Sequence, residues 1–408
     1  MSHRNTNANH DEPRGSIGKV IIVTPFENRM AKRGTRLPRL AELLVQGGFD
    51  VEYVTTNFSH AYKRHFSESE IQERRGIEPY ELTVIPIPAY TKNMSARRIW
   101  CNIVMSIRCF KYLWRKTNRN DVVLVPSRPV SLILSMAILK LFRKVRLVMD
   151  IRDVWPDALA GKSGLKMKMF SAYCNTCLYP SVRHFDAFTH ISPSFVDWLH
   201  RYAPKANSKF IPPGFDRSRW ERCSEKTKPP GSPITVAFVG LLQHQLDVMP
   251  MLESLLTRPE VKLYIVGDDG TGERYPEVIQ FVDENKLENV EMVGRLSPEA
   301  VVEFLSGIDI GLIPMISNSI PNKVFDCIAA YLPMIVLGNE DCASFVREHD
   351  IGWSCQFDAK ELGELIDELT PAHVFEKSKN VAAIRNQFAR DLLFRDFIDI
   401  IESRHEEH

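Results

Sequence analysis

Residues 19–24 read Lys-Val-Ile-Ile-Val-Thr, a short β-branched run of the kind that forms a buried strand. A loop follows, and leucines then recur at helical spacing from Leu37 to Leu44, before Gly47-Gly48 ends the pattern. Residues 51–55 again have the composition of a strand. This strand–loop–helix–strand order predicts a parallel sheet, because a crossover helix joins strands that run in the same direction.

The same alternation of strand-like apolar runs and helical segments extends through the rest of the chain. Further strands are expected at residues 81–86, 121–125, 145–150 and 187–191. The pattern restarts with Ile-Thr-Val-Ala-Phe-Val-Gly at residues 234–240 and continues at 261–267, 290–294, 308–313 and 334–338. Two such units in succession predict an α/β protein with two Rossmann-like, doubly wound parallel-sheet domains that face a cleft.

The expected domain boundaries lie where the alternation of strands and helices is interrupted. The run Phe210-Ile-Pro-Pro-Gly-Phe215 has the composition of a hinge. We expect a flexible tail at residues 1–17, a first domain at 18–210 and a second at 211–380. A last helical run, at about residues 381–402 of a final segment 381–408, is expected to pack back on the first domain. A chain of 408 residues is long enough for two cores.

Composition favours an ordinary soluble protein, with 44% apolar and 25% charged residues. No apolar run approaches the roughly 18–20 residues of a membrane span, and the polar opening residues lack the apolar segment of a signal peptide. We therefore expect a cytoplasmic protein. The eight cysteines include a lone Cys-x-x-Cys at Cys174 and Cys177, which favours buried thiols over a metal or redox site.

The net charge of +1 conceals an uneven distribution of charge. Residues 1–210 carry about 33 Lys and Arg against about 17 Asp and Glu, and the remaining residues carry the balancing negative excess. A cationic half favours a polyanionic partner, either an anionic membrane surface or nucleic acid. Nucleic acid is disfavoured because the basic residues are not interleaved with aromatics in a recognisable module. The alternative is that the two halves attract each other across the cleft.

Candidate functional residues follow the expected strands, because ligands of open parallel sheets bind beyond the carboxyl ends of the strands. Arg29 and Arg36 come after the first strand. The segment Arg152-Asp-Val-Trp-Pro156 comes after the strand that ends at residue 150. A charge cluster is usually a solvated surface, but a loop at the end of a sheet that combines Arg152, Asp153 and Trp155 favours function.

The strongest segment is residues 318–330, Asn-Ser-Ile-Pro-Asn-Lys-Val-Phe-Asp-Cys-Ile-Ala-Ala. Pro321 and Asn322 fit the start of a helix, whose unpaired N–H groups form an anion site suited to a pyrophosphate. Lys323 would add positive charge there, and Asp326, about one turn further on, could accept hydrogen bonds from a ribose diol. The alternative is an ordinary capped helix with both side chains in water.

This segment resembles the second-domain signature of the bacterial glycosyltransferase family 4, which has the GT-B fold. Ser192-Pro-Ser194, Ile211-Pro-Pro-Gly-Phe-Asp216 and residues 290–314 also resemble that family, and the likeness covers about residues 18–405. Arg152-Asp-Val-Trp-Pro156 is similar to the subgroup that includes L-fucosamine transferases of surface-polysaccharide assembly. The resemblance implies a hexosyltransferase that uses a nucleotide-diphosphate sugar.

The resemblance also assigns roles to individual residues. Asp326 stands where the family has the acidic residue that holds the ribose, and the neutral Asn318 stands where it has a second acidic residue, near the donor sugar. Gly240 falls on the family's glycine loop, but Leu-Leu-Gln-His at residues 241–244 replaces the basic residues often found beyond it. The expected donor-binding residues are Gly240, Gly267, Arg295, Asn318, Pro321, Asn322, Lys323 and Asp326.

We expect catalysis without a metal, because helix N–H groups and a Lys or Arg can stabilise the departing diphosphate. The expected catalytic residues are Asp153 and Arg152. Asp153 would act as the base if the anomeric configuration inverts. If it is retained, the resemblance implies that the leaving phosphate takes the proton. The expected acceptor-binding residues are Arg29, Arg36, Arg128 and Trp155.

Residues 97–116 predict a basic amphipathic helix. Its expected apolar face consists of Ile99, Ile103, Ile107, Phe110 and Trp114. Such a helix can lie in a lipid headgroup layer, which favours a lipid-linked acceptor and a peripheral position at the inner face of the cell membrane. A second basic cluster, at residues 140–146, adds to this surface. The alternative is that the apolar face covers the first sheet.

Two other functions remain open. The neutral Asn318 and the missing basic residues after Gly240 would suit a non-catalytic paralogue that serves as the partner of another transferase. A nucleotide-sugar epimerase can share the fold, but it would need no cationic acceptor domain. The base, the sugar and the linkage are not specified by these motifs, because pockets discriminate them through a few hydrogen bonds.

Overall fold

The computed structural model describes residues 17–31, 36–92, 95–159, 164–268 and 270–403. The tail expected at residues 1–17 lies outside this part of the chain, apart from Ile17. The chain divides into two compact units. Unit 1 comprises Met1–Asp150, Gly164–Phe188 and Ile398–His408, and unit 2 comprises Ile151–Ser163 and Thr189–Phe397. The boundaries expected at residues 210 and 380 stay predictions.

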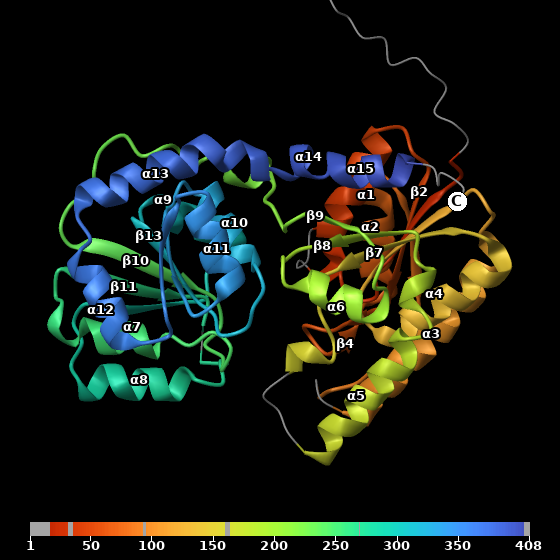
Figure 1. Cartoon of the computed structure of the whole chain (residues 1–408), viewed down its shortest axis with the longest axis horizontal. Coiled ribbons are helices and arrows are strands. Elements are labelled where there is room, and N and C mark those ends of the chain that lie inside the picture. The colour runs from red at the N-terminus through yellow and green to blue at the C-terminus, as the bar shows by residue number, and fades with distance from the viewer. Residues whose placement is uncertain (1–16, 32–35, 93–94, 160–163, 269, 404–408) are drawn as a thin grey trace, which may run out of the picture. The chain divides into compact units, whose positions relative to one another are not determined.

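The first sheet has seven strands in the order β5-β2-β1-β6-β7-β8-β9 (Figure 1). They are β1 (Val20–Val23), β2 (Val51–Thr56), β5 (Glu81–Ile85), β6 (Val122–Pro126), β7 (Arg146–Ile151), β8 (Ala187–His190) and β9 (Ser208–Phe210). The central ladders are parallel, and Val20 pairs with Val51 on one side and Val122 on the other. The strand order reverses between β1 and β6, which makes their carboxyl ends the switch point of this sheet. A short antiparallel pair, β3 (Phe58–Ser59) and β4 (Arg64–His65), follows β2.

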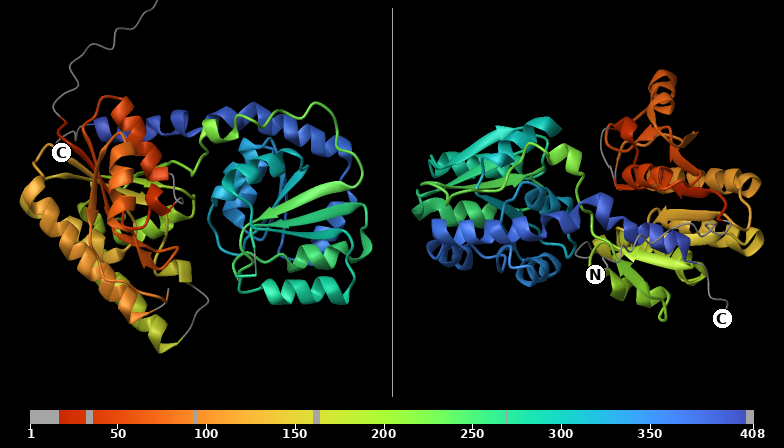
Figure 2. Two further views of the ribbon diagram at one scale, coloured as in Figure 1. Left: turned by 180° about the vertical axis from the view of Figure 1, so that it is seen from behind. Right: turned by 90° about the horizontal axis from the view of Figure 1, so that it is seen from above.

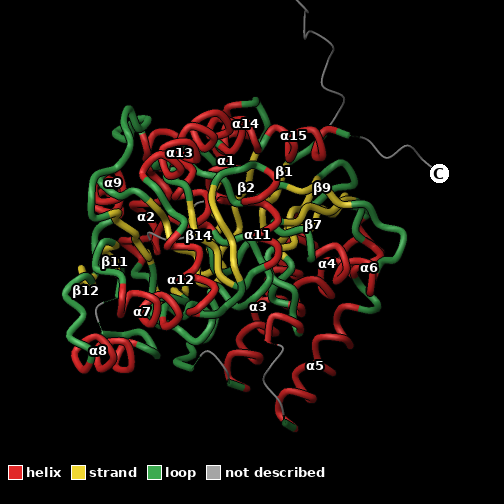
Figure 3. The backbone as a smooth tube through the Cα atoms, turned by 60° about the vertical axis from the view of Figure 1, so that its left-hand side comes forward, coloured by secondary structure: helices red, strands yellow, loops and turns green. Residues whose placement is uncertain are grey.

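Local sequence signals explain the helices of unit 1. They are α1 (Arg36–Gln46), α2 (Glu68–Ile77), α3 (Ala96–Lys116), α4 (Val130–Arg143) and α5 (Leu165–Leu178). Helix α1 buries Leu37, Leu40 and Leu44, and Gly48 beyond its end has a φ of +84°. Helix α2 begins with a capping box between Ser67 and Glu70. Helix α4 packs against both α3 and α5 (Figure 1). Figure 3 marks the helices in red.

The second sheet has six strands in the order β12-β11-β10-β13-β14-β15. They are β10 (Ile234–Val239), β11 (Val261–Val266), β12 (Val290–Gly294), β13 (Ile310–Pro314), β14 (Met334–Leu337) and β15 (Gly352–Cys355). All its ladders are parallel, and the order reverses between β10 and β13. Every strand expected from the sequence is present, so the prediction of two doubly wound sheets is confirmed. β9 and β15 were not expected.

Helices lie on both faces of the second sheet (Figure 2). The helices of unit 2 that precede the last two of the chain are α6 (Phe195–Tyr202), α7 (Met249–Ser254), α8 (Tyr275–Glu284), α9 (Pro298–Ser306), α10 (Asn322–Ala329), α11 (Glu340–Glu348), α12 (Ala359–Asp367) and α13 (Pro371–Arg385). One buried cluster gathers residues of α9, α10, α11 and α13, and another gathers residues of α7, α8 and α12. The sheet therefore has a separate hydrophobic core on each side.

The C-terminal run is not the single helix expected at residues 381–402. Helix α13 ends at Arg385, and α14 (Arg390–Leu393) and α15 (Arg395–Glu402) follow a break. The break arises because Phe215 forms a β-bridge with Ala389 and bonds the backbone on either side of it. The end of α15 belongs to unit 1, where Arg146 Nη1 donates to the carbonyl of the buried Ile401 (2.7 Å). The expectation that the C-terminal helix returns to the first sheet is therefore confirmed.

Candidate functional site

Two glycines shape the switch point of the second sheet. Gly240 follows β10 with a φ of +155°, and its N–H donates to the carbonyl of Val266 (2.7 Å). Gly267 follows β11 with a φ of +99°, and its N–H donates to the carbonyl of Gly294 (2.7 Å). A Cβ on Gly240 would lie 2.0 Å from Lys323 Nζ. A glycine at this position therefore leaves the space that the ammonium group occupies.

Lys323 lies in the first turn of α10, and its ammonium group reaches the end of β10. Its Nζ donates to the carbonyl of Val239 (2.5 Å) and lies 4.4 Å from the centre of the Phe238 ring. Burial lowers the pKa of Lys323 from 10.5 to about 8, while Asp326 and Cys327 act in the opposite direction. Because an ammonium group has three N–H bonds, the contact with Val239 leaves two for an anion.

The start of α10 adds further donors beside Lys323. Its N-cap residue is Pro321, and within the described residues no side chain caps the first turn. The N–H of Ile320, just before the cap, donates to Ser192 Oγ (2.6 Å). The uncapped N–H groups therefore begin at Asn322, where the partial positive charge of a helix N-terminus favours an anion.

Asp326 lies about one turn further along α10 and is partly exposed. In the described part of the chain, no group donates a hydrogen bond to its carboxylate. Burial raises the pKa of Asp326, while the positive charges of Arg219, Arg390 and Lys323 lower it. A carboxylate that accepts no other hydrogen bond can accept one from each hydroxyl of a ribose diol.

A buried carboxylate holds the loop that follows Gly240. Asp268 Oδ2 accepts from the N–H of Leu242 (2.7 Å), and Oδ1 accepts from those of Gly270 (3.0 Å) and Gly272 (3.2 Å). The side chain of Leu242 is fully buried in unit 2, where a basic side chain would lose its hydration. Sequence reasoning missed Asp268, although the glycine-rich run directly after a strand was a usable signal.

Asn318 and Arg295 have other surroundings. Asn318 Oδ1 accepts from the N–H of Glu340 (3.2 Å), so it helps to cap α11. The adjacent N-cap residue, Asn339, donates to the carbonyl of Ser319 (2.7 Å). Arg295 follows β12 and is exposed. The structure thus brings together Gly240, Gly267, Lys323 and Asp326, and the donor roles of Asn318 and Arg295 stay predictions.

The segment after β7 is anchored on α6. Trp198 Nε1 donates to the carbonyl of Trp155 (2.9 Å), and the guanidinium of Arg201 binds both oxygens of Asp157 (2.9 and 2.7 Å). Arg152 and Asp153 lie just before these anchors and are half-buried. The segment therefore has a defined conformation at the end of a strand, as a catalytic loop requires.

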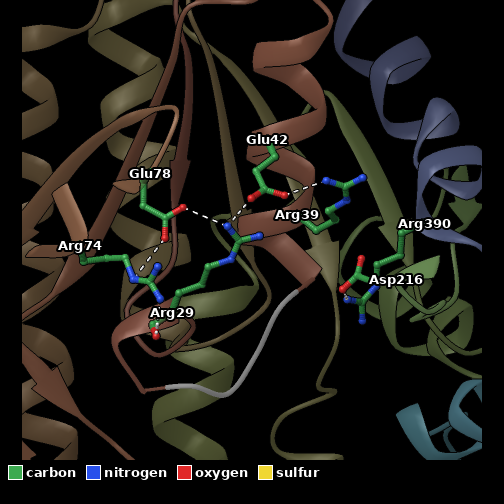
Figure 4. Close-up of polar contacts among 7 residues, drawn as sticks. All are labelled: Arg29, Arg39, Glu42, Arg74, Glu78, Asp216 and Arg390. Atoms are coloured by element: carbon green, nitrogen blue, oxygen red, sulfur yellow. Dashed lines mark hydrogen bonds and ion pairs between the residues drawn. The ribbon is translucent and has the colours of Figure 1, made fainter. Parts of the chain in front are cut away.

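Two arginines expected to bind the acceptor form ion pairs inside unit 1. Arg29 pairs with Glu42 and, at 3.1 Å, with Glu78 (Figure 4). Arg36 is buried, and its Nε and Nη2 lie 3.2 and 3.3 Å from the oxygens of Asp150. Carboxylates of unit 1 therefore compensate both charges, and the pair with Asp150 fixes the start of α1. Their acceptor roles stay predictions.

Helices α3, α4 and α5 expose large apolar side chains. The buried stripe of α3 consists of Cys101, Met105, Cys109 and Leu113. The other face, expected to be apolar, leaves Ile107 and Trp114 exposed by 47% and 38%. Trp114 lies 5.4 Å from Phe142 of α4, which is 66% exposed. Ile99, Ile103 and Phe110 of the same face are half-buried, so this face is only partly exposed. Its exposed residues count against the alternative that the whole face covers the first sheet.

The same three helices are strongly basic. They contain no Asp or Glu. Their basic residues are Arg97, Arg98, Arg108, Lys111, Arg115 and Lys116 on α3, Lys140 and Arg143 on α4, and Lys166 and Lys168 on α5. We call the exposed side chains of α3, α4 and α5 the three-helix surface.

The described residues contain neither a helix with the length and hydropathy needed to cross a bilayer nor a group of three or more His, Cys, Asp or Glu placed to hold a metal ion. Cys174 and Cys177 are buried free thiols.

Family models match both parts of the chain. Residues 34–214 match the model described as "Glycosyl transferase 4-like domain", and residues 233–370 match "Glycosyl transferases group 1". TuaH of Bacillus subtilis (strain 168), a protein named for glycosyl transfer in teichuronic acid biosynthesis, is 23% identical over 205 residues. That match spans 47% of this chain and 50% of TuaH, so the chain matches only half the length of this curated relative.

Solved structures share the fold over nearly the whole chain. A sucrose-phosphate synthase from Thermosynechococcus elongatus superposes with a TM-score of 0.71 and 13% identity, covering 94% of this chain and 98% of that one. Anabaena HepE in complex with UDP-glucose superposes with a TM-score of 0.66 and 11% identity, covering 95% and 100%. At these identities the likeness shows the fold alone.

Proposed function

The chain belongs to the GT-B glycosyltransferases, and we propose that it transfers a sugar from a nucleotide-diphosphate sugar to a membrane-associated, lipid-linked glycan acceptor. The matches to two glycosyltransferase models and the fold of HepE support this proposal. The relative TuaH is named for teichuronic acid biosynthesis, which supports our proposal of a role in surface polysaccharide or glycoconjugate biosynthesis. The resemblance to L-fucosamine transferases remains part of the proposal.

The main support for the proposed donor site is the contact between Lys323 and the end of β10. The contact lies at the switch point of the second sheet, where doubly wound sheets bind their ligands. A diphosphate there would accept from the uncapped N–H groups at Asn322 and from Lys323 Nζ. Asp326 would receive the ribose hydroxyls one turn away. The N–H groups at the start of α10 and the ammonium group of Lys323 then stabilise the negative charge that develops on the departing diphosphate.

A thermal-shift panel of UDP, GDP and ADP tests the donor site. One nucleotide should raise the melting temperature, and Lys323→Ala and Asp326→Ala should each abolish the rise. Lys360→Ala, which removes an exposed lysine of α12, is the matched control and should respond as the parent does. Unchanged responses in both site variants would place the donor elsewhere. A protein that binds no nucleotide would instead support the non-catalytic paralogue.

Asp153 is our proposed base and Arg152 its cationic neighbour. A half-buried carboxylate on a segment anchored by Trp198 can take the proton of an acceptor hydroxyl if the reaction inverts. Asp153→Asn should then reduce turnover by at least the roughly 100-fold typical of a positioned base, with nucleotide binding unchanged. Asp157→Asn, which breaks only the pair with Arg201, is the control. Normal turnover in Asp153→Asn would remove this role.

We further propose that the transfer needs no metal ion, since helix donors and Lys323 supply the positive charge. Turnover should survive prolonged treatment with EDTA followed by desalting. A loss of activity that Mg²⁺ or Mn²⁺ restores would contradict this part of the proposal.

The three-helix surface is our proposed membrane contact, and its occupant is an anionic lipid bilayer. Exposed Trp114 and Phe142 can enter the headgroup layer while the surrounding basic residues face lipid phosphates. Since each basic residue near anionic lipid contributes about 1 kcal/mol, Lys111→Gln with Arg115→Gln should weaken vesicle binding about 30-fold.

Vesicle co-sedimentation measures this binding. The protein should pellet with phosphatidylglycerol-containing vesicles at low salt, much less at high salt, and not with pure phosphatidylcholine vesicles. Lys262→Gln with Lys360→Gln, which removes the same charge from unit 2, is the control. Absence of binding to anionic vesicles at low salt, or equal loss in the control, would refute the membrane contact.

A further inference from the structure

The start of α10 is reached through a loop, so contacts with other segments determine how its first turn is oriented. Residues 315–321 join β13 to α10. The proposed anion site consists of backbone N–H groups that begin at Asn322, and an N–H group points where the backbone directs it. A group that holds the residues just before Pro321 therefore affects the geometry of the donor site.

Ser192 holds the residue directly before the N-cap of α10. The N–H of Ile320 donates to Ser192 Oγ (2.6 Å), and both residues are completely buried. The next residue, Pro321, has a φ of −78°, and its ring prevents rotation about that bond. Few rotations thus separate the amide of Ile320 from that of Asn322. The hydroxyl of Ser192 therefore constrains the direction of the first uncapped N–H group.

The start of α11 holds the residue before Ile320. Asn339 Nδ2 donates to the carbonyl of Ser319 (2.7 Å), and the thiol of Cys342 donates to the same oxygen (3.3 Å). These contacts act on a carbonyl group, whereas Ser192 acts on an N–H group one residue closer to the anion site. The loop is thus held at two successive residues, and Ser192 holds the one next to the cap.

Ser194 ties the segment that contains Ser192 to α11. Its hydroxyl donates to Asp341 Oδ2 (2.6 Å), and its backbone N lies 3.4 Å from the same oxygen. Asp341 lies in the first turn of α11 and is buried. A serine directly before a helix usually caps that helix, but this hydroxyl donates to α11 instead of accepting from α6. The segment Ser192-Pro-Ser194 thus contacts the residues that start both α10 and α11.

Helix α6 connects this segment with the proposed catalytic loop. It starts directly after Ser194, and its Trp198 donates to the carbonyl of Trp155 (2.9 Å). Asp153 belongs to unit 2, as α6 and α10 do. One short segment therefore joins the helix that anchors the proposed base to the helix that carries the proposed phosphate site.

We infer that Ser192 is a positioning residue of the donor site: its hydroxyl orients the first N–H groups of α10 toward the diphosphate, and Ser194 holds its segment in place through Asp341. The inference rests on the proposed donor site at Lys323 and deepens it. An N–H group that already points at the diphosphate needs no reorganisation when the ligand binds, which raises affinity. Loss of the Ser192 hydroxyl should keep the ammonium group of Lys323 but weaken the contribution of the helix amides.

Isothermal titration of the full chain measures this contribution. The probe is whichever of UDP, GDP and ADP gives the largest thermal shift. Ser192→Ala removes the acceptor, and Ser192→Cys fills the same position with sulfur, which is a weak acceptor. The pair of variants therefore separates the hydrogen bond from packing. Circular dichroism establishes that each variant is folded at the assay temperature, so a loss of affinity does not reflect unfolded protein.

Thr370→Ala is the matched control, because Thr370 Oγ1 accepts from the N–H of His373 (3.2 Å) at the start of α13. Thr370→Ala and Ser192→Ala each remove a hydroxyl acceptor from a helix start of unit 2. A merely structural role of Ser192 would lower stability and leave the nucleotide affinity of the folded protein unchanged.

Ser192→Ala and Ser192→Cys should each weaken nucleotide binding about fivefold, because the net value of one neutral hydrogen bond sets the scale. Ser194→Ala, which removes a support of the same segment, should weaken binding about twofold. Thr370→Ala should bind as the parent does. In Ser192→Ala the affinity should still fall as the pH rises through 8, because Lys323 retains its ammonium group.

Unchanged affinity in Ser192→Ala, parental affinity in Ser192→Cys, or an equal loss in Thr370→Ala would overturn the inference. If neither Ser192 variant folds, unchanged affinity in Ser194→Ala would overturn it. Failure of the proposed donor site gives a different result: the parent would bind none of the three nucleotides, or Lys323→Met would bind as tightly as the parent.

Discussion

Replacement of Lys323 by methionine should remove the pH dependence of donor binding. Methionine keeps the length and apolar stem of the lysine, so it can lie over the Phe238 ring beside Gly240. It loses the ammonium group, whose pKa of about 8 places its titration in an accessible pH range. A diphosphate binds the protonated lysine, so affinity in the parent should fall as the pH rises through 8.

The size of the effect follows from this pKa. Lys323 is about 90% protonated at pH 7 and about 10% protonated at pH 9. If only the protonated form binds, the dissociation constant of the nucleoside diphosphate should rise about tenfold between these pH values. In Lys323→Met it should be high throughout and nearly constant, apart from titration of the ligand itself.

Isothermal titration at pH 7, 8 and 9, with the nucleotide that gives the largest thermal shift, measures both curves. The difference between parent and variant removes the titration of the nucleotide and of other groups. Parallel curves for the two proteins would refute the assignment of Lys323 to the diphosphate. Lys360→Met, at an exposed lysine, should retain the full pH dependence of the parent.

The unliganded protein should show a linked change in stability. The folded protein releases the Lys323 proton near pH 8, and the unfolded chain holds it up to about 10.5. The unfolded state therefore binds more protons between these values, so stability should rise with pH there, relative to Lys323→Met. The largest rise in the free energy of unfolding is about 3 kcal/mol, because each pKa unit corresponds to roughly 1.4 kcal/mol. Urea unfolding at pH 7 and pH 10 tests the sign.

Three further substitutions test other parts of the structure. Asp326→Asn should weaken nucleotide binding about tenfold but not change binding of the 2′,3′-dideoxynucleotide, if the carboxylate holds the ribose; an equal loss for both would contradict that role. Asp268→Ala leaves three backbone N–H groups without an acceptor and should lower the free energy of unfolding by about 3 kcal/mol in urea. Arg36→Met leaves Asp150 buried beside an apolar group and should cost about 3–5 kcal/mol, part of which Asp150→Asn should restore.

Periodic signals in the sequence were sufficient to predict the two sheets. Buried parallel strands are continuous apolar runs, and Ile234–Val239 and Val261–Val266 are of this kind. The prediction that Pro321 opens a helix was equally local, because proline is favoured at helix starts and Lys323 and Asp326 then fall one turn apart. These parts of the fold and of the donor site depend on neighbours in the sequence.

Features that depend on distant partners could not be predicted. Arg36 was expected to meet a ligand, but its partner Asp150 is 114 residues away along the chain. Helix α3 has two apolar stripes, and only its packing on α4, including the contact between Ser106 and Ser131, decides which of them is buried. The break in the C-terminal run depends likewise on Phe215, which precedes it by more than 170 residues.

The hydrogen bond between Arg146 and Ile401 has a consequence for synthesis of the protein. The two residues are 255 positions apart, and Ile401 is completely buried in unit 1. The segment that completes unit 1 is therefore synthesised after every strand of the second sheet. Until residue 401 has been made, a nascent chain would expose the patch of unit 1 that Ile401 covers. A chain truncated before residue 401 would keep this patch exposed.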